Sequence, residues 1–206
     1  MYVPKFYRNE NVEEMTAFVK RNNFGILLSL DERQRIIGTH IPFVVSTNDK
    51  GIVLTAHISK ANEQWKSIQA NSEVLVIFSG EHAYISSSWY DHNNVPTWNY
   101  IAAHLYGTVR ILNEVETWSH LQALVDQHEA FEKNPISMES MGEDYVRREM
   151  KGLLAFEMQC SEMQSAFKLS QNRDANNIHN VIAALENRGD ENAIAIAKAI
   201  KKQRNL

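Results

Sequence analysis

The sequence of 206 residues contains one cysteine, four prolines and eight glycines, and it has no long apolar run. The single cysteine, Cys160, excludes an intramolecular disulfide and a Cys-x-x-Cys metal site. No segment approaches the roughly 18 consecutive apolar residues of a membrane-spanning helix. Residues 1–6 lack the basic-then-apolar order of a signal peptide. These features predict a cytoplasmic protein without a membrane partner.

Several motifs of catalysis and nucleotide binding are also missing. The sequence has no glycine-rich loop of the P-loop or dinucleotide type and no Gly-x-Ser-x-Gly nucleophile motif. Its eight histidines lack the close spacing of zinc ligands. We therefore assign no catalytic residue and no metal ligand from the sequence, and whether the protein is an enzyme stays open.

The net charge of the sequence is slightly negative, and the charged residues are unevenly distributed. The sequence has 21 Lys and Arg against 25 Asp and Glu, a formal charge of −4, which argues against non-specific coating of nucleic acid. Between Ser67 and Val109 there is no Lys or Arg, yet this window carries seven aromatic residues. Such a band predicts burial in a barrel core, in an oligomer interface or around a planar ligand.

The C-terminal residues 192–206 carry four basic residues and no acidic one: Lys198, Lys201, Lys202 and Arg204. On a helix these residues share much of one side, where they would meet DNA phosphates. Basic residues also stabilise the C-terminus of a helix through its dipole. Both interpretations stay open, and DNA is therefore one candidate partner.

The hydrophobic pattern predicts short strands in an antiparallel arrangement, with helices appended. We expect six or seven strands, among them 24–30, 35–45, 52–57, 73–78, 101–112 and 152–158. We expect helices at 11–22, 59–70, 114–131 and 142–150, followed by a helix–Gly189–helix pair capped by Asp174 and Asp190. Gly107 marks a bulge or a close backbone approach. The fold class is α+β, with a closed or half-closed barrel.

A phosphate site is indicated where the strand over 52–57 gives way to the next helix. There Ser59 supplies a hydroxyl and Lys60 an ammonium, next to the free N–H groups expected at a helix start. The alternative is that Ser59 only caps the helix and Lys60 is solvated. His40 and His57 lie on neighbouring expected strands. Two roles stay open for them: buried histidines that hydrogen-bond to the backbone, or a haem ligand.

Seven sequence blocks, in the same order, resemble the PaiB-type proteins, described as FMN-binding negative transcriptional regulators of bacteria. The resemblance extends from Met1 to about residue 185. The blocks are 2–6 (YVPKF), 39–43 (THIPF), 57–65, 82–86 (HAYIS), 88–90 (SWY), 95–100 (VPTWNY) and 167–173 (FKLSQNR). The family's common Asp-Arg pair after the last block is replaced by Asn177-Ile178.

The resemblance implies a split β-barrel like that of pyridoxamine-phosphate oxidases, usually a homodimer with flavin between the subunits. Residues 1–170 would form the barrel, and residues 171–206 a C-terminal helical extension packed on it. In that superfamily a Ser/Arg-Lys block at a strand end holds the FMN phosphate, and Ser59 and Lys60 match it. The full set of cofactor-binding residues implied here is Thr39, His40, Thr55, His57, Ser59, Lys60, Asn62, Trp98 and Asn99.

Three functions follow from the fold and the resemblance. The first is a homodimeric repressor that binds FMN, with DNA contacted through the basic C-terminal helix. The second is an FMN-dependent oxidoreductase of a small substrate, in which His40, His57 or Tyr84 would serve as acid or base. The third is a haem-binding split-barrel protein.

Overall fold

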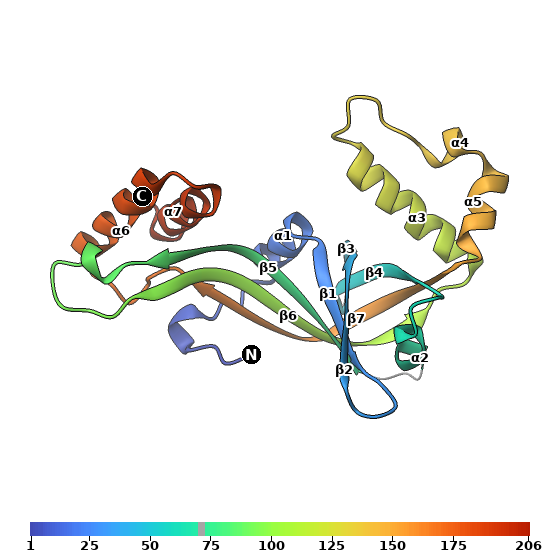
Figure 1. The fold of residues 1–206 in the computed structure, drawn as a ribbon, viewed down its shortest axis with the longest axis horizontal. Coiled ribbons are helices and arrows are strands. Elements are labelled where there is room, and N and C mark those ends of the chain that lie inside the picture. The colour runs from blue at the N-terminus through green and yellow to red at the C-terminus, as the bar shows by residue number, and fades with distance from the viewer. Residues whose placement is uncertain (70–72) are drawn as a thin grey trace. The chain divides into compact units, whose positions relative to one another are not determined.

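The computed structural model describes residues 1–69 and 73–206 and contains one sheet of seven strands in the order β2-β1-β5-β6-β7-β4-β3 (Figure 1). β1 pairs antiparallel with both β2 and β5, and β4 pairs antiparallel with both β3 and β7. The described strands are β1 (Phe24–Leu30), β2 (Ile36–Pro42), β3 (Val44–Asn48), β4 (Gly51–Ser59), β5 (Glu73–Ile85), β6 (Thr97–Ile111) and β7 (Leu153–Lys168). The α+β fold class is therefore confirmed.

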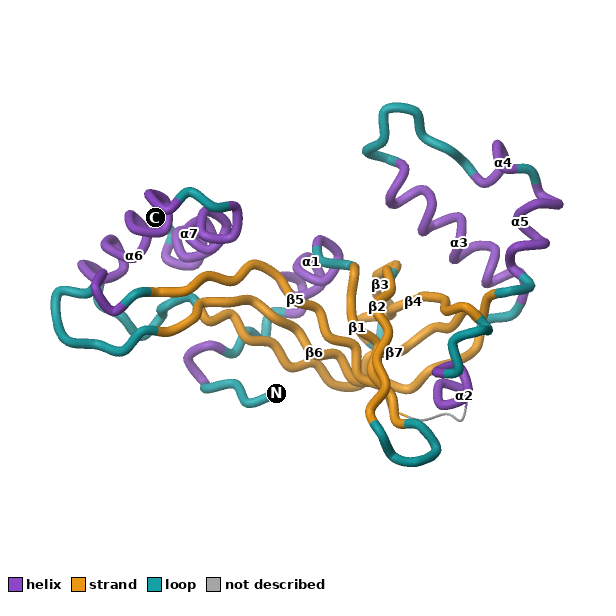
Figure 2. The backbone as a smooth tube through the Cα atoms, viewed as in Figure 1, coloured by secondary structure: helices purple, strands orange, loops and turns teal. Residues whose placement is uncertain are grey.

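The helices lie before, between and after the strands (Figure 2). Their bounds are η1 (Lys5–Tyr7), α1 (Val12–Arg21), α2 (Gln64–Gln69), η2 (Ser87–Trp89), α3 (Glu114–Glu129), α4 (Met138–Met141), α5 (Glu143–Met150), α6 (Ala175–Arg188) and α7 (Glu191–Arg204). The expected C-terminal helical pair is present as α6 and α7.

The chain divides by its internal contacts into two compact units. The first unit consists of Met1–Met15, Ser79–Ala103 and Gln164–Leu206, and the second of Thr16–Phe78 and His104–Met163. The boundary expected at residue 170 falls within the first unit and stays a prediction.

In the first unit, the ends of the helical pair are set by the residues that the sequence indicates. The Asp174 carboxylate accepts a hydrogen bond from Asn177 N at the start of α6, and Asp190 does the same for Ala193 N at the start of α7. Gly189 ends α6 with φ +77°, a conformation that favours glycine. The pair buries an apolar stripe that includes Leu185 and Ile196.

In the second unit, α3 packs through Trp118, Leu121 and Val125 against a small core of α4 and α5 residues. Asn113 begins α3 with a capping box closed by Glu116. By helical spacing Val115 shares a side of α3 with Trp118, Leu121 and Val125, yet Val115 is 75% exposed. The reason is that α4 and α5 cover a narrower stripe of the helix than the apolar pattern suggests.

Two expected elements differ in their bounds. The apolar run at 35–45 forms parts of two strands, β2 and β3, which meet at Phe43. The helix expected at 59–70 begins only at Gln64, and its last expected residue lies outside the described residues. The later start arises because Ser59 Oγ accepts a hydrogen bond from Ala61 N and Asn62 Oδ1 accepts one from Gln64 N, so residues 59–63 form turns.

Gly107 on β6 is the point of close backbone approach that the sequence predicts. A Cβ atom at this position would lie 2.2 Å from Gln159 O on β7, the neighbouring strand. Because the obstacle is backbone, no side-chain rotation relieves the clash. β6 and β7 therefore depend on glycine here for their spacing.

We expect Gly107→Ala to lower the free energy of unfolding by about 1–3 kcal/mol, since the β7 backbone must shift to admit the methyl group. Urea-induced unfolding measures this change. Gly152→Ala is the matched control, because a Cβ there meets only Glu149 O at 3.4 Å. Equal stabilities of the two variants would contradict the close approach at Gly107.

Candidate functional site

β4 presents three of the expected cofactor-binding residues on one of its faces. Side chains alternate along a strand, so Thr55, His57 and Ser59 share a face while Ala56 and Ile58 point into the core. The antiparallel register with β7 pairs Thr55 with Glu157 and Ser59 with Leu153. The site is therefore built on a strand whose opposite face is anchored in the core.

A chain of hydrogen bonds links two of these residues to His120 of α3. His57 Nδ1 lies 3.0 Å from His120 Nε2, and His120 Nδ1 lies 3.1 Å from Thr55 Oγ1. Burial lowers the pKa of His57, while burial and the charge of His57 together lower the pKa of His120 to about 4. Both rings are therefore neutral at pH 7 and share a proton between facing nitrogen atoms.

His40 does not take part in this chain. On β2 it lies opposite Ile26 of β1, is exposed, and stacks on Phe24 with 6.2 Å between ring centroids. The expectation that His40 and His57 lie on neighbouring strands is wrong, because β2 pairs with β1 while β4 pairs with β3 and β7. His57 contacts His120 instead.

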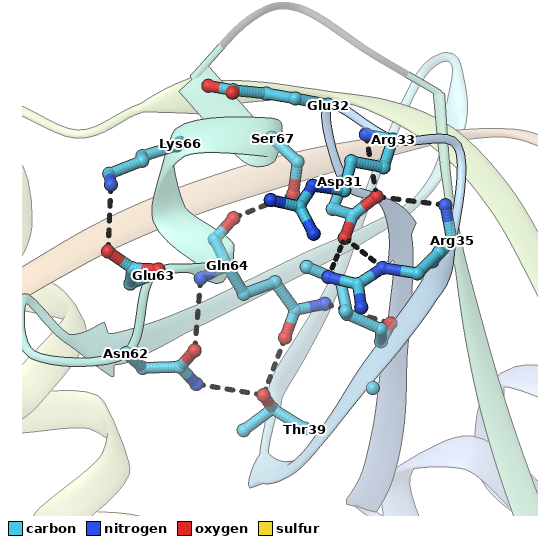
Figure 3. A pocket seen from close by; sticks show the side chains of 12 residues that line it. Asp31, Glu32, Arg33, Arg35, Thr39, Asn62, Glu63, Gln64, Lys66 and Ser67 are labelled. Atoms are coloured by element: carbon cyan, nitrogen blue, oxygen red, sulfur yellow. Dashed lines mark hydrogen bonds and ion pairs between the residues drawn. The ribbon is translucent and has the colours of Figure 1, made fainter.

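Thr39 and Asn62 contact each other in the lining of a cavity of about 560 Å³ (Figure 3). Asn62 Nδ2 donates to Thr39 Oγ1 at 2.8 Å, and Gln64 N donates to Asn62 Oδ1 at 3.0 Å. The buried Gln64 side chain accepts from Thr39 and donates to Leu27 O and Ser29 Oγ. This network ties α2 to β1 and β2 and fixes the positions of Thr39 and Asn62.

Lys60 lines a second cavity, of about 570 Å³. Lys60 Nζ donates to Lys151 O at 2.7 Å, beyond the end of α5, and its backbone N donates to Gly152 O at 2.8 Å. An ammonium group has three N–H donors, so two stay available for a ligand. The charged residues that line the cavity are Lys60, Glu114, Asp144, Arg147, Arg148 and Lys151. Arg147 is already paired with Glu114 and Glu143, and Arg148 with Glu149, so Lys60 and Lys151 are the lining cations without an ionic partner among the described residues. Lysine ammonium groups of this kind fit a phosphate group.

Trp98 and Asn99 lie on β6 in the first unit, whereas the other seven expected residues belong to the second unit. Asn99 is fully buried, and its Nδ2 donates to Ser170 Oγ at 2.8 Å. Trp98 is 53% exposed and contacts the rings of Tyr84 and His82. Whether these nine residues bind a cofactor stays a prediction.

Sequence reasoning did not find His120, Gln64 or the α5 cations. For His120 the sequence shows only a histidine within an expected amphipathic helix, since its burial appears only in the structure. Gln64 lies within the block 57–65, but its contacts and those of Arg147 depend on segments far away in the sequence, so the sequence does not predict them.

Within residues 1–69 and 73–206, no three His, Cys, Asp or Glu side chains lie close enough together to hold a metal ion. In the same part of the chain, no helix is long and apolar enough to cross a membrane.

The sheet and its appended helices define a split β-barrel, and similar solved structures support this fold class. The "FAD and Heme binding protein" from Mycobacterium smegmatis has a TM-score of 0.60 at 15% identity and covers 86% of this chain and 80% of its own. The "Flavocytochrome Anf3" from Azotobacter vinelandii has a TM-score of 0.60 at 14% identity. The match covers 81% of this chain and 72% of that protein.

A family model described as "Putative FMN-binding domain" matches residues 1–162. The chain is also 37% identical over 201 residues to "Protease synthase and sporulation protein PAI 2" of Bacillus subtilis (strain 168), over 98% of this chain and 97% of that protein. The chain therefore belongs to this FMN-binding-domain family, that of the PaiB-type proteins, as its sequence blocks predict.

The buried histidine pair predicts a loss of stability in acid. A histidine whose folded pKa lies below its unfolded value stabilises the fold fully above the unfolded pKa, near 6.5. That stability is lost as the pH falls from 6.5 towards 4, because His57 and His120 bind protons in the unfolded chain but stay neutral in the folded one. For His120, with a folded pKa of about 4, the loss is of the order of 3 kcal/mol.

Urea unfolding of the wild type and of His120→Gln, between pH 7.5 and 4.5, measures this dependence. The glutamine side chain of the variant has no proton to gain, so we expect a shallower loss of stability in the variant. Parallel curves for the two proteins would show that the histidine pair does not cause the acid dependence.

Proposed function

We propose that the chain is a cytoplasmic, homodimeric, FMN-binding negative transcriptional regulator. The observation that supports it most is the match of residues 1–162 to an FMN-binding-domain family, together with the PAI 2 relative. The cation-lined cavity at Lys60 supplies the charge that a flavin phosphate needs. Exposed aromatic side chains at Tyr84 and Trp98 are consistent with a surface that a second subunit covers.

In this proposal, Ser59 and Lys60 hold the phosphate of FMN through the Ser59 hydroxyl and the two remaining Lys60 donors. Thr55 and His57 face the ring system or the ribityl chain from β4, and Thr39, His40 and Asn62 contribute from β2 and the turn before α2. Trp98 and Asn99, on β6 in the first unit, stay predicted cofactor residues without an assigned contact. When bound, FMN supplies reversible redox chemistry, which would let a regulator respond to redox state.

The phosphate assignment predicts different effects on FMN and on riboflavin, which lacks the phosphate. We expect Ser59→Ala/Lys60→Ala to weaken FMN binding about 10- to 100-fold, because two charge-assisted contacts are lost. Riboflavin binding should stay unchanged. Quenching of flavin fluorescence during titration gives both dissociation constants.

Lys198→Ala is the matched control, since Lys198 is an exposed lysine of α7. An equal loss of riboflavin binding would contradict a phosphate role for Ser59 and Lys60. Failure of the wild type to bind either flavin would contradict the flavin proposal itself.

An FMN-dependent oxidoreductase is the second candidate function. It is supported by the flavocytochrome neighbour and by the hydrogen-bonded chain from Thr55 through His120 to His57. That chain holds a proton between two neutral rings on the face of β4 assigned to the flavin. NAD(P)H oxidation by flavin-loaded protein separates this function from regulation. Haem binding is the third candidate, and a Soret band on haem addition tests it.

DNA binding through α7 depends on which of its cations are available. Lys201 Nζ lies 2.6 Å from Glu186 Oε1, Lys202 Nζ lies 3.5 Å from Glu14 Oε1, and Arg204 donates to the carbonyls of Gln171 and Arg173. Lys198 has no ionic partner among the described residues. It is therefore the α7 cation best placed to meet a DNA phosphate.

We expect a salt-sensitive mobility shift with promoter DNA, and Lys198→Gln should reduce the slope of log K against log salt by about 0.9. Lys201→Gln is the matched comparison, because its ammonium is already paired with Glu186 and should change the slope less. The absence of any shift at low salt would contradict direct repression.

A further inference from the structure

The cavity of about 560 Å³ in the second unit has charged walls that the flavin proposal does not use (Figure 3). One wall is the turn between β1 and β2, and the other is the start of α2. The lining carries three acidic and three basic side chains: Asp31, Glu32, Glu63, Arg33, Arg35 and Lys66. Because these charges balance, the cavity as a whole favours neither a simple anion nor a simple cation.

Four of these six charges are already paired within the lining. Arg35 Nη2 lies 2.7 Å from Asp31 Oδ2, and Arg35 Nε donates to the same oxygen atom at 2.8 Å. Lys66 Nζ lies 2.8 Å from Glu63 Oε1. The side chains of Glu32 and Arg33 have no hydrogen-bond or ion-pair partner among the described residues. One carboxylate and one guanidinium are therefore left for a ligand.

The turn between β1 and β2 holds the backbone of these two residues in place. Asp31 Oδ1 accepts hydrogen bonds from Arg33 N at 2.8 Å and from Arg35 N at 2.9 Å. Asp31 N also donates to Arg35 O at 2.9 Å. Figure 3 shows the side chains of Glu32 and Arg33 extending from this turn towards α2. A ligand bound there orders two side chains on a backbone that is already held, which limits the entropic cost of binding.

The wall formed by α2 is also anchored. Gln64 is 2% exposed, and its side-chain amide is hydrogen-bonded through both its oxygen and its nitrogen atom. Glu63 above all, and Glu32 to a smaller extent, raise the pKa of Lys66. The charge of Glu32 therefore acts across the cavity on α2, although its own oxygen atoms stay unpaired.

We propose that this cavity binds a small zwitterion, an α-amino acid, whose carboxylate pairs with Arg33 and whose ammonium group pairs with Glu32. The planar guanidinium matches a carboxylate with two parallel hydrogen bonds. The site, called here the turn–α2 site, shares only Thr39 and Asn62 with the residues assigned to FMN. Neither of these two residues carries a charge, so the proposal does not rest on the flavin proposal.

The unpaired charges select against a ligand that carries only one charge. A carboxylate without an amine gains the contact with Arg33 but brings its negative charge near Glu32. An amine without a carboxylate meets Glu32 but is repelled by Arg33. An α-amino acid satisfies both groups at once. Asn62 Nδ2 gives one of its two hydrogen atoms to Thr39, so the second can meet an acceptor on a polar ligand side chain, as in glutamine.

Two-dimensional ¹H–¹⁵N NMR of the full chain, titrated with L-glutamine, tests the proposal. We expect saturable shifts of the backbone amides within residues 31–39 and 62–67. N-acetyl-L-glutamine lacks the positive charge of the amino acid, and L-glutaminamide lacks its negative charge. We expect each of these two analogues to bind at least about tenfold more weakly than L-glutamine.

Two variants assign the two charges separately. In Arg33→Gln, L-glutamine should lose its advantage over L-glutaminamide, because the partner of the carboxylate is gone. In Glu32→Gln, L-glutamine should lose its advantage over N-acetyl-L-glutamine, because the partner of the ammonium group is gone. Lys198→Gln and Glu132→Gln are the matched controls, since both residues are exposed and lie outside the cavity. Both controls should leave the dissociation constants unchanged.

The absence of saturable shifts with L-glutamine, or equal binding of the three ligands to the wild type, would overturn the assignment to a zwitterion. Shifts confined to residues outside 31–39 and 62–67 would overturn the site. Should a variant fail to fold, the comparison of the three ligands on the wild type decides the question.

A parallel titration with FMN separates this site from the flavin proposal. We expect Arg33→Gln to leave FMN binding unchanged. FMN-induced shifts at residues 31–39 that Arg33→Gln abolishes would assign the cavity to the flavin and overturn the turn–α2 site. Binding of L-glutamine without binding of FMN or riboflavin would contradict the flavin proposal alone.

Discussion

The register of β4 against β7 is the constraint on which the candidate site depends. Ala56 pairs with Phe156, and both are fully buried, so the core fixes which face of β4 turns outward. A slip of one residue would turn His57 into the core and bring Ala56 to the site. The contact of His57 with His120 and that of Lys60 with the end of α5 both follow from this register.

Two kinds of buried polar group serve different purposes in this chain. Gln64 is buried with its side-chain amide satisfied on both sides, and it positions the residues around it. His57 and His120 are likewise paired with each other. Asn99 is equally buried, but its carbonyl oxygen has no partner in the described structure. Satisfied networks of this kind hold a fold in one conformation, whereas an unpaired buried oxygen lowers the stability of the fold.

Local sequence signals predicted those features whose causes are local. β1 matches its expected range because an apolar run is bounded by turn residues on both sides, and Gly189 ends α6 as expected. The strands β5, β6 and β7 extend further than the apolar pattern, because polar residues continue the strand once a neighbouring strand pairs with them. The partner of His57 could not be predicted, since His120 is 63 positions away and reaches it only through the packing of α3.

The net charge of the sequence does not predict which cations of the folded chain are available to bind an anion. A formal charge of −4 and a basic C-terminus single out α7, the part of the sequence with most uncompensated cations. In the structure, however, Lys201 is paired with Glu186, and Arg204 donates to two backbone carbonyls. Lys60 has two spare donors, and neither Lys60 nor Arg173 has an acidic partner among the described residues. A cation attracts a ligand according to what already neutralises it, and only the folded chain determines that.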